Sequence, residues 1–225
     1  MVSQNDNGIF YNCFRNKCGI RGYLDGSGWI APKNTSVKRE VVPVPQTVAL
    51  PQELYQYLPV QTLSVPPRWR SDWSMVMYPV LSYWGAQLGY VQRHYKELND
   101  WWNGAKALNV VNDNSQPFLH FPLLTNEKMC GSLYVVEDIP SAEAIAPYAA
   151  SCALLGTNIT QEALTLFREI GVMHLKICLD NDAIGKAVQL RRNLGLIFDE
   201  VSVIWVDKDP KNMYQDELEE IFDEK

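Results

Sequence analysis

The C-terminal half of the sequence repeats one pattern, in which a short apolar run is followed by a stretch of helical character. The apolar runs do not alternate polar and apolar residues, and they lie at Leu133–Glu137, Cys152–Leu155, His174–Leu179 and Val201–Val206. The helical stretches between them lie at Ser141–Ala150, Gln161–Ile170 and Ala183–Leu194. Continuous apolar runs are typical of parallel strands covered on both faces, and right-handed crossovers place helices on both sides. The sequence therefore predicts an α/β fold with a four-stranded parallel sheet.

Acidic residues follow three of the four predicted strands. Glu137 ends the first run, Asp180 ends the third with Asp182 two residues later, and Asp207 and Asp209 follow the fourth. In open α/β sheets ligands bind at the carboxyl ends of the strands. If the first and third strands are neighbours, Glu137 and Asp180 face each other, and carboxylates that close repel unless a cation neutralises them.

Oxygen ligands of this kind suit a hard divalent ion, Mg²⁺ or Mn²⁺. A single acid after a strand has a simpler interpretation, because Asp180 or Asp182 could cap the helix that begins at Ala183. Three strand ends at one edge of the sheet favour the metal site.

The preceding part of the chain has a different character. Prolines recur through residues 30–71 with β-branched residues between them, which predicts an extended linker with at most one short helix near Gln52–Tyr57. Residues 72–128 are mixed and β-rich. There, Met75–Leu81 and Leu88–Arg93 flank a turn at Trp84 and Gly85 and predict a hairpin.

Charge is distributed unevenly along the chain. The formal net charge is −6, but residues 1–128 hold 12 Lys and Arg against 9 Asp and Glu, whereas residues 129–225 hold 8 against 17. The acidic total argues against a simple basic nucleic-acid coat, while the mildly basic first part can still face phosphate. Residues 214–225 are expected to form an acidic C-terminal helix or tail.

Several other classes of protein are excluded or disfavoured. No apolar run is long enough to span a membrane, and the N-terminus lacks the pattern of a secretory signal. Five cysteines are an odd number for a disulfide framework, so we expect a cytoplasmic protein. The sequence lacks the G-x-S-x-G, H-E-x-x-H and P-loop motifs. The three scattered histidines, His94, His120 and His174, are expected to be structural.

Three motifs of the C-terminal half resemble, in order, those of the Toprim domain, the Rossmann-like catalytic fold shared by bacterial-type DNA primases, topoisomerases and some nucleases. They are VVEDIPSA (Val135–Ala142), LDNDAIGKA (Leu179–Ala187) and DKDPKNM (Asp207–Met213). The sequence departs from the family at Asp138, where a glycine usually follows the glutamate.

The Toprim resemblance implies catalytic and metal-binding roles for particular residues. Glu137, Asp180 and Asp182 would bind the catalytic Mg²⁺ or Mn²⁺, and Asp209 is a further candidate metal ligand.

The region before these motifs is similar to the part of primases that precedes Toprim. The similarity lies in Met75–Arg93, in KALN (Lys106–Asn109) and in FLHF (Phe118–Phe121). It implies that Arg93, Lys106 and Asn109 bind nucleotide or DNA, and phosphate binding suits the two basic residues. Tryptophans offer candidate base-stacking surfaces, although most are expected to be core residues; they are Trp69, Trp73, Trp84, Trp101 and Trp102.

The segment GIFYNCFRNKCGIRG (Gly8–Gly22) resembles the second half of the zinc ribbon of phage primases. A four-ligand zinc site needs a second pair of Cys or His residues, and none precedes Cys13 and Cys18. The ribbon has decayed, a partner supplies the missing ligands, or the two cysteines are buried thiols. We expect decay and no bound zinc.

Together these features predict five regions. They are a zinc-ribbon remnant at 1–29, a Pro-rich linker at 30–71, a small mixed α+β primase subdomain at 72–128, a Toprim catalytic domain at 129–213 and the acidic end at 214–225.

The resemblance implies a phage- or bacterial-type DNA primase without a helicase domain, which synthesises short RNA primers from NTPs on single-stranded DNA. A separate replicative helicase would be its partner, in the host cytoplasm if a phage encodes it, and no membrane would be involved. Two alternatives stay open: a non-catalytic replication accessory that binds DNA or helicase, and a Toprim metal-dependent nuclease.

Overall fold

The computed structural model divides into two compact units, Met1–Lys38 and Arg39–Lys225. It describes residues 41, 43, 45–59, 63–96 and 106–223, without the side chain of Asn181, together with the backbone of four strands near the N-terminus. Each unit is considered by itself.

The first unit contains an antiparallel sheet with strand order β1-β2-β3-β4. Its strands are β1 (Val2–Asn5), β2 (Gly8–Asn12), β3 (Arg21–Asp25) and β4 (Gly28–Ile30). Cys13 and Cys18 lie outside the described residues, so the zinc-ribbon remnant stays a prediction.

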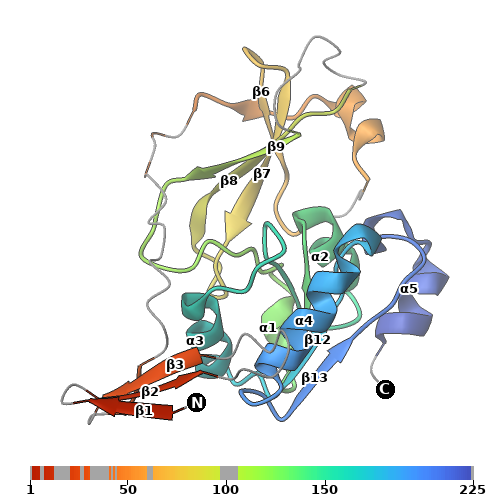
Figure 1. Ribbon diagram of the computed structural model, residues 1–225. Coiled ribbons are helices and arrows are strands. Elements are labelled where there is room, and N and C mark those ends of the chain that lie inside the picture. Colours follow the sequence, from red (N-terminus) through yellow and green to blue (C-terminus); the bar gives the residue numbers. More distant parts are fainter. Residues whose placement is uncertain are drawn as a thin grey trace. The chain divides into compact units, whose positions relative to one another are not determined.

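The second unit contains the predicted four-stranded parallel sheet (Figure 1). Its strands are β10 (Ser132–Val136), β11 (Ser151–Ala153), β12 (His174–Ile177) and β13 (Glu200–Val203). The order is β11-β10-β12-β13, and every neighbouring pair is parallel. The prediction of a mixed α/β fold with this sheet is confirmed. The order also makes the first and third strands neighbours, which the sequence left conditional.

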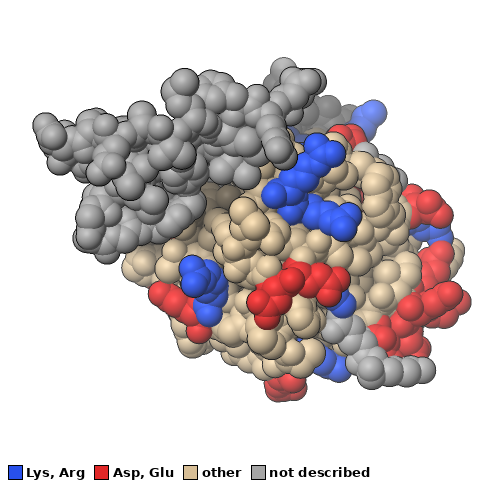
Figure 2. Space-filling model, turned by 60° about the horizontal axis from the view of Figure 1, so that its bottom comes forward, with Lys and Arg blue, Asp and Glu red and all other residues tan. Residues whose placement is uncertain are grey.

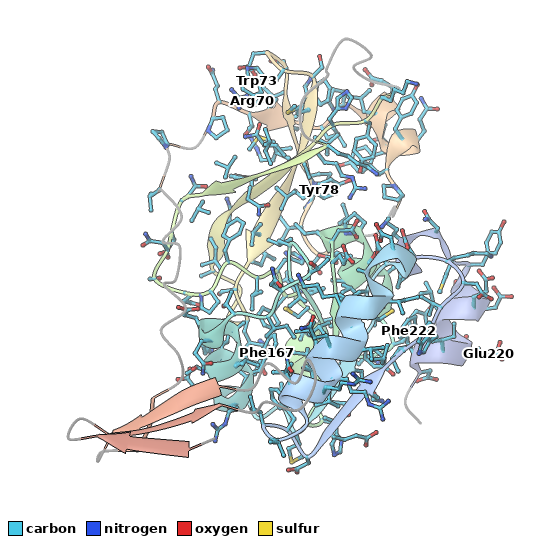
Figure 3. The ribbon with its side chains drawn as sticks, viewed as in Figure 1. Arg70, Trp73, Tyr78, Phe167, Glu220 and Phe222 are labelled. Atoms are coloured by element: carbon cyan, nitrogen blue, oxygen red, sulfur yellow. The ribbon has the colours of Figure 1, made fainter. Side chains whose placement is uncertain are left out.

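Helices cover both faces of the parallel sheet. The longer ones are α2 (Ile139–Ile145), α3 (Gln161–Glu169), α4 (Ile184–Leu194) and α5 (Gln215–Phe222). The short ones are α1 (Thr125–Lys128), η2 (Asn181–Ala183) and η3 (Pro210–Asn212). Phe167 of α3 and Phe222 of α5 belong to two different core clusters and are both fully buried (Figure 3). Alternate residues of β10 supply the two clusters, Leu133 and Val135 to one and Tyr134 and Val136 to the other.

Helix α2 is shorter than the predicted helix at Ser141–Ala150. It begins at Ile139, because the Asp138 carboxylate accepts a hydrogen bond from the Ser141 amide and caps the first turn. It ends at Ile145, two residues before Pro147. Pro147 has no amide hydrogen, so one helical hydrogen bond is lost at this point, although Ala146 keeps helical backbone angles.

A five-stranded antiparallel sheet precedes the parallel one, with strand order β5-β6-β7-β8-β9. Its strands are β5 (Val48–Ala49), β6 (Arg68–Arg70), β7 (Met75–Leu81), β8 (Gln87–Arg93) and β9 (Ala107–Val111), and η1 (Gln52–Tyr57) lies between the first two. The predicted hairpin is the β7–β8 pair, with Gly85 in its turn at φ +82°. The predicted linker at 30–71 contains β5, η1 and β6, so part of that range belongs to the folded unit.

The two sheets of the second unit share one core. Val76 and Tyr78 of β7 pack in the same cluster as Tyr134 of β10 and Ile145 of α2. The antiparallel sheet therefore lies on the side of the parallel sheet that α2 and α5 cover. None of the helices in the described part of the chain combines the length and apolar character needed to cross a membrane.

Candidate metal centre

Three carboxylates meet at the carboxyl ends of β10 and β12. Glu137 directly follows β10, Asp180 follows β12 by three residues, and Asp182 lies in η2. One carboxylate oxygen of each lies within 4.8 Å of those of the others. The Asp180 amide donates a hydrogen bond of 3.2 Å to Glu137 Oε1, which fixes the two loops together. The structure thus brings together the three predicted catalytic residues.

The electrostatics of this cluster favour a cation. Burial, together with the nearby charge of Asp180, raises the pKa of Glu137 to about 7. Burial also raises the pKa of Asp180, and Lys211 opposes that rise. Both pKa shifts mean that the protein alone does not fully neutralise the negative charges of Glu137 and Asp180. An all-oxygen set of half-buried and exposed carboxylates fits Mg²⁺ or Mn²⁺, and these three residues would hold it.

Asp138 follows the first of these acids but points to different partners. Its Oδ1 caps α2, and its Oδ2 accepts hydrogen bonds from Arg93 at 2.8 Å and from Lys211 at 3.0 Å. Burial alone would raise the pKa of Asp138, but the charges of Lys211 and Arg93 outweigh it and lower the pKa to about 2. Asp138 is therefore a structural anion in an ion-pair network beside the cluster.

Asp209 belongs to the same ion-pair network. Lys211 Nζ lies 2.9 Å from Asp209 Oδ2, and Asp209 is not a member of the three-carboxylate group. Its role as a further metal ligand stays a prediction. Lys211, only 9% exposed, was not selected from the sequence. The signal was present, since it stands inside the third Toprim-like motif.

The three predicted nucleotide-binding residues have different surroundings. Arg93, at the end of β8, reaches the network through Asp138. Ala107 pairs with Arg93, so Lys106 lies beside the end of β8, and its carbonyl accepts a hydrogen bond from the His94 amide. Asn109 pairs with Val91, and both Lys106 and Asn109 are exposed. Of these three residues, only Arg93 has a described contact with the ion-pair network beside the carboxylate cluster.

A second buried interaction holds α2 in place. His120 Nε2 lies 3.0 Å from Glu143 Oε1, and both side chains are at most 4% exposed. The other Glu143 oxygen accepts hydrogen bonds from the amide and hydroxyl of Ser64. Because the Leu81 amide donates to His120 Nδ1, His120 has a structural role, as expected. Asp138 and Glu143 thus anchor α2 at two points five residues apart.

Three of the candidate stacking tryptophans lie in or beside the strands of the antiparallel sheet. Trp69 packs against the shared core, Trp84 is exposed in the β7–β8 turn, and the Arg70 guanidinium lies 4.1 Å from the centroid of the Trp73 ring (Figure 3). Trp101 and Trp102 lie outside the described residues. Trp205, which is 64% exposed two residues after β13, was not selected from the sequence.

A similar fold occurs in proteins of known structure. No protein-family model and no curated protein matches the chain. Solved structures do match. The RNA polymerase domain of Mycobacterium tuberculosis primase DnaG aligns with a TM-score of 0.55 and 15% identity, over 77% of this chain and 62% of that one. The fold is similar to that of primase catalytic domains.

Two further structures share this primase-like fold. The zinc-binding and RNA polymerase domains of Aquifex aeolicus primase align with a TM-score of 0.52 and 17% identity, over 67% of this chain and 39% of that one. The E. coli primase catalytic core aligns with a TM-score of 0.51 and 22% identity, over 66% and 50%. The chain thus spans 39–62% of the length of these structures. At such low identity the similarity establishes the fold alone.

Proposed function

We propose that this protein is a DNA primase that joins ribonucleotides into short primers on single-stranded DNA. The observation that carries the proposal is the group of Glu137, Asp180 and Asp182 at adjacent strand ends within a primase-like fold. Two similar structures are a DnaG catalytic domain bound to single-stranded DNA and an M. tuberculosis domain in complex with double-stranded DNA. They support a DNA template for this chain.

In this mechanism the three carboxylates would hold one or two Mg²⁺ or Mn²⁺ ions. When bound, such ions lower the pKa of an attacking 3′-hydroxyl and neutralise the incoming triphosphate and the departing pyrophosphate. Glu137 and Asp180 are fixed against each other by the 3.2 Å hydrogen bond and orient this site. Arg93 offers a guanidinium for phosphate oxygens next to it.

The charge distribution suggests that the divalent ions also help to bind the nucleotide. On the face shown in Figure 2, the described Lys and Arg side chains form small groups beside acidic ones, without a continuous basic stripe. We expect nucleotide binding to depend on divalent ions at the three-carboxylate group, because its negative charges would otherwise repel a triphosphate. Phage origin and a separate helicase partner remain predictions from the sequence resemblance.

Primer synthesis on a single-stranded template, with NTPs and Mg²⁺ or Mn²⁺, tests the proposal. Replacing Asp180 and Asp182 together with Ala should reduce product by about 100-fold or more, because the charge that holds the ions is lost. The matched control replaces Asp199 and Glu200 with Ala. These two exposed acids lie at the opposite end of a strand of the same sheet, and their loss should leave activity unchanged.

The same assay separates the alternatives. Cleavage of labelled DNA that needs the metal but not NTPs would identify a nuclease. DNA binding without product, in a protein that does not bind Mn²⁺, would identify a non-catalytic accessory. Full activity in the Asp180→Ala, Asp182→Ala variant would refute the metal assignment.

A further inference from the structure

The ion-pair network next to the metal site joins three separate elements. Arg93 comes from the end of β8, Asp138 from the start of α2 and Lys211 from η3. Both cations donate to one oxygen, Asp138 Oδ2, at 2.8 and 3.0 Å. Asp138 is also the neighbour in sequence of Glu137, so the pair of cations is fixed at the border of the carboxylate cluster.

The two cations keep hydrogen-bonding capacity that the protein does not use. A guanidinium has five N–H donors and an ammonium has three. Within the described residues, Arg93 donates one hydrogen bond, to Asp138, and its Nε has no partner. Lys211 donates to Asp138 and Asp209, which leaves one proton. Because Arg93 Nε is buried, the donors that remain for an anion with several oxygens are those of the Arg93 Nη atoms and of Lys211 Nζ.

Without Asp138 the two cations would not stay together. Arg93 and Lys211 carry like charges, and their side chains are only 13% and 9% exposed, so water screens them weakly. The shared oxygen holds them at hydrogen-bond distance from one point. Of the two cations, Asp209 contacts only Lys211, so it cannot replace Asp138 as the link between Arg93 and Lys211.

Neither the cap nor simple charge balance requires this arrangement. Asn or Ser at position 138 would cap α2 as well as Asp does. A carboxylate that served only as a counter-charge would weaken the binding of a phosphate, so its removal would strengthen that binding. A carboxylate that serves to position the cations would have the opposite effect on removal. The two roles therefore predict opposite changes in phosphate affinity when the Asp138 carboxylate is removed.

We propose that Asp138 is a positioning residue, which holds Arg93 and Lys211 as a preformed site for the polyphosphate of the incoming nucleotide. This inference rests on the proposed function and deepens it. It assigns Lys211 to phosphate binding together with Arg93, and it gives a role to Asp138, the acid at which the sequence departs from the Toprim pattern.

Direct binding of inorganic tripolyphosphate in the presence of Mg²⁺ tests the proposal by calorimetry on the full chain. In Asp138→Asn the affinity for tripolyphosphate should fall about tenfold, corresponding to loss of one or two charge-assisted contacts. The affinity for Mn²⁺ alone should change less than about twofold, because the three metal-site carboxylates remain. Asp138→Ser, which also keeps the cap, should behave in the same way.

Steady-state primer synthesis provides the second measurement. The KM for NTP should rise about tenfold in Asp138→Asn, while kcat changes less than about threefold, as expected for lost substrate binding. Glu220→Gln is the control, since this acid is exposed on α5, and both parameters should stay at the wild-type values (Figure 3).

The outcomes separate this inference from the proposed function. If wild type makes no primers but binds tripolyphosphate and Asp138→Asn loses that binding, the primase proposal fails and the positioning role stands. If wild type makes primers and Asp138→Asn has an equal or lower KM, the positioning role fails alone. Wild-type protein that does not bind tripolyphosphate with Mg²⁺ would also overturn the positioning role.

Discussion

Removing the charge of Glu137 should stabilise the metal-free protein. Burial and the charge of Asp180 raise the pKa of this carboxyl from 4.5 to about 7, so ionised Glu137 destabilises the folded protein. Glu137→Gln removes that charge and keeps an Oε1 that can accept the hydrogen bond from the Asp180 amide. The variant should therefore unfold at a higher temperature than wild type when no divalent ion is present.

The size and sign of this effect follow from the pKa difference. A pKa of 4.5 in the unfolded chain and about 7 in the folded one corresponds to at most about 3.4 kcal/mol. Because the cluster is partly exposed, solvent screening reduces this to about 1–2 kcal/mol. Between those pH values the folded state binds more protons than the unfolded state, so wild-type stability falls as pH rises and the loss is complete above about pH 7.

Thermal unfolding in a chelator at about pH 4.5 and about pH 8 measures the effect. At the higher pH, Glu137→Gln should melt about 3–6 °C above wild type, and at the lower pH the difference should nearly vanish. Mn²⁺ should raise the melting temperature of wild type more than that of the variant. Glu220→Gln is the matched control and should match wild type at both pH values. An equal gain at both pH values, or a loss at the higher one, would refute the electrostatic reasoning.

Two further predictions concern the framework that holds the site. Gly89→Ala should lose more than about 3 kcal/mol of stability in urea unfolding, because φ is +154° and the added Cβ would lie 2.1 Å from the Val110 carbonyl oxygen. The control Gly185→Ala has open space around its Cβ and should be neutral or gain up to about 1 kcal/mol. Equal effects of the two substitutions would contradict this account. Phe222→Ala should lower the free energy of unfolding by about 3–5 kcal/mol, since the ring is fully buried. Ile221 is 40% exposed, and Ile221→Ala should lower it far less. A similar loss for both variants would show that α5 does not depend on its buried face.

Local sequence patterns were sufficient for the four parallel strands and the main helices of the C-terminal half, but not for the ends of α2. Four apolar runs with helical stretches between them predict parallel strands, because strands buried on both faces need apolar residues at every position. The positions of Glu137 and Asp180 at strand ends follow from the same pattern. The β7–β8 hairpin was also predictable, since its turn chemistry lies within a few adjacent residues.

Other features depend on contacts between residues far apart in the chain. The antiparallel sheet includes β5 and β6, which lie in a proline-rich range that reads locally as a linker. Asp209 also follows a predicted strand and was a further candidate ligand, but Lys211 pairs with it outside the three-carboxylate group. Propensity and periodicity act over a few residues and carry no information about such partners.

The sequence by itself determined that this chain has a parallel α/β half with acids at the carboxyl ends of its strands. Only the tertiary structure decided that β10 and β12 are neighbours, which brings Glu137 beside Asp180, and that Asp138 joins Arg93 to Lys211. Secondary structure follows from local backbone and side-chain preferences. The order of the strands and the choice of ion-pair partners follow from the packing of a common core, in which residues distant in sequence exclude water together.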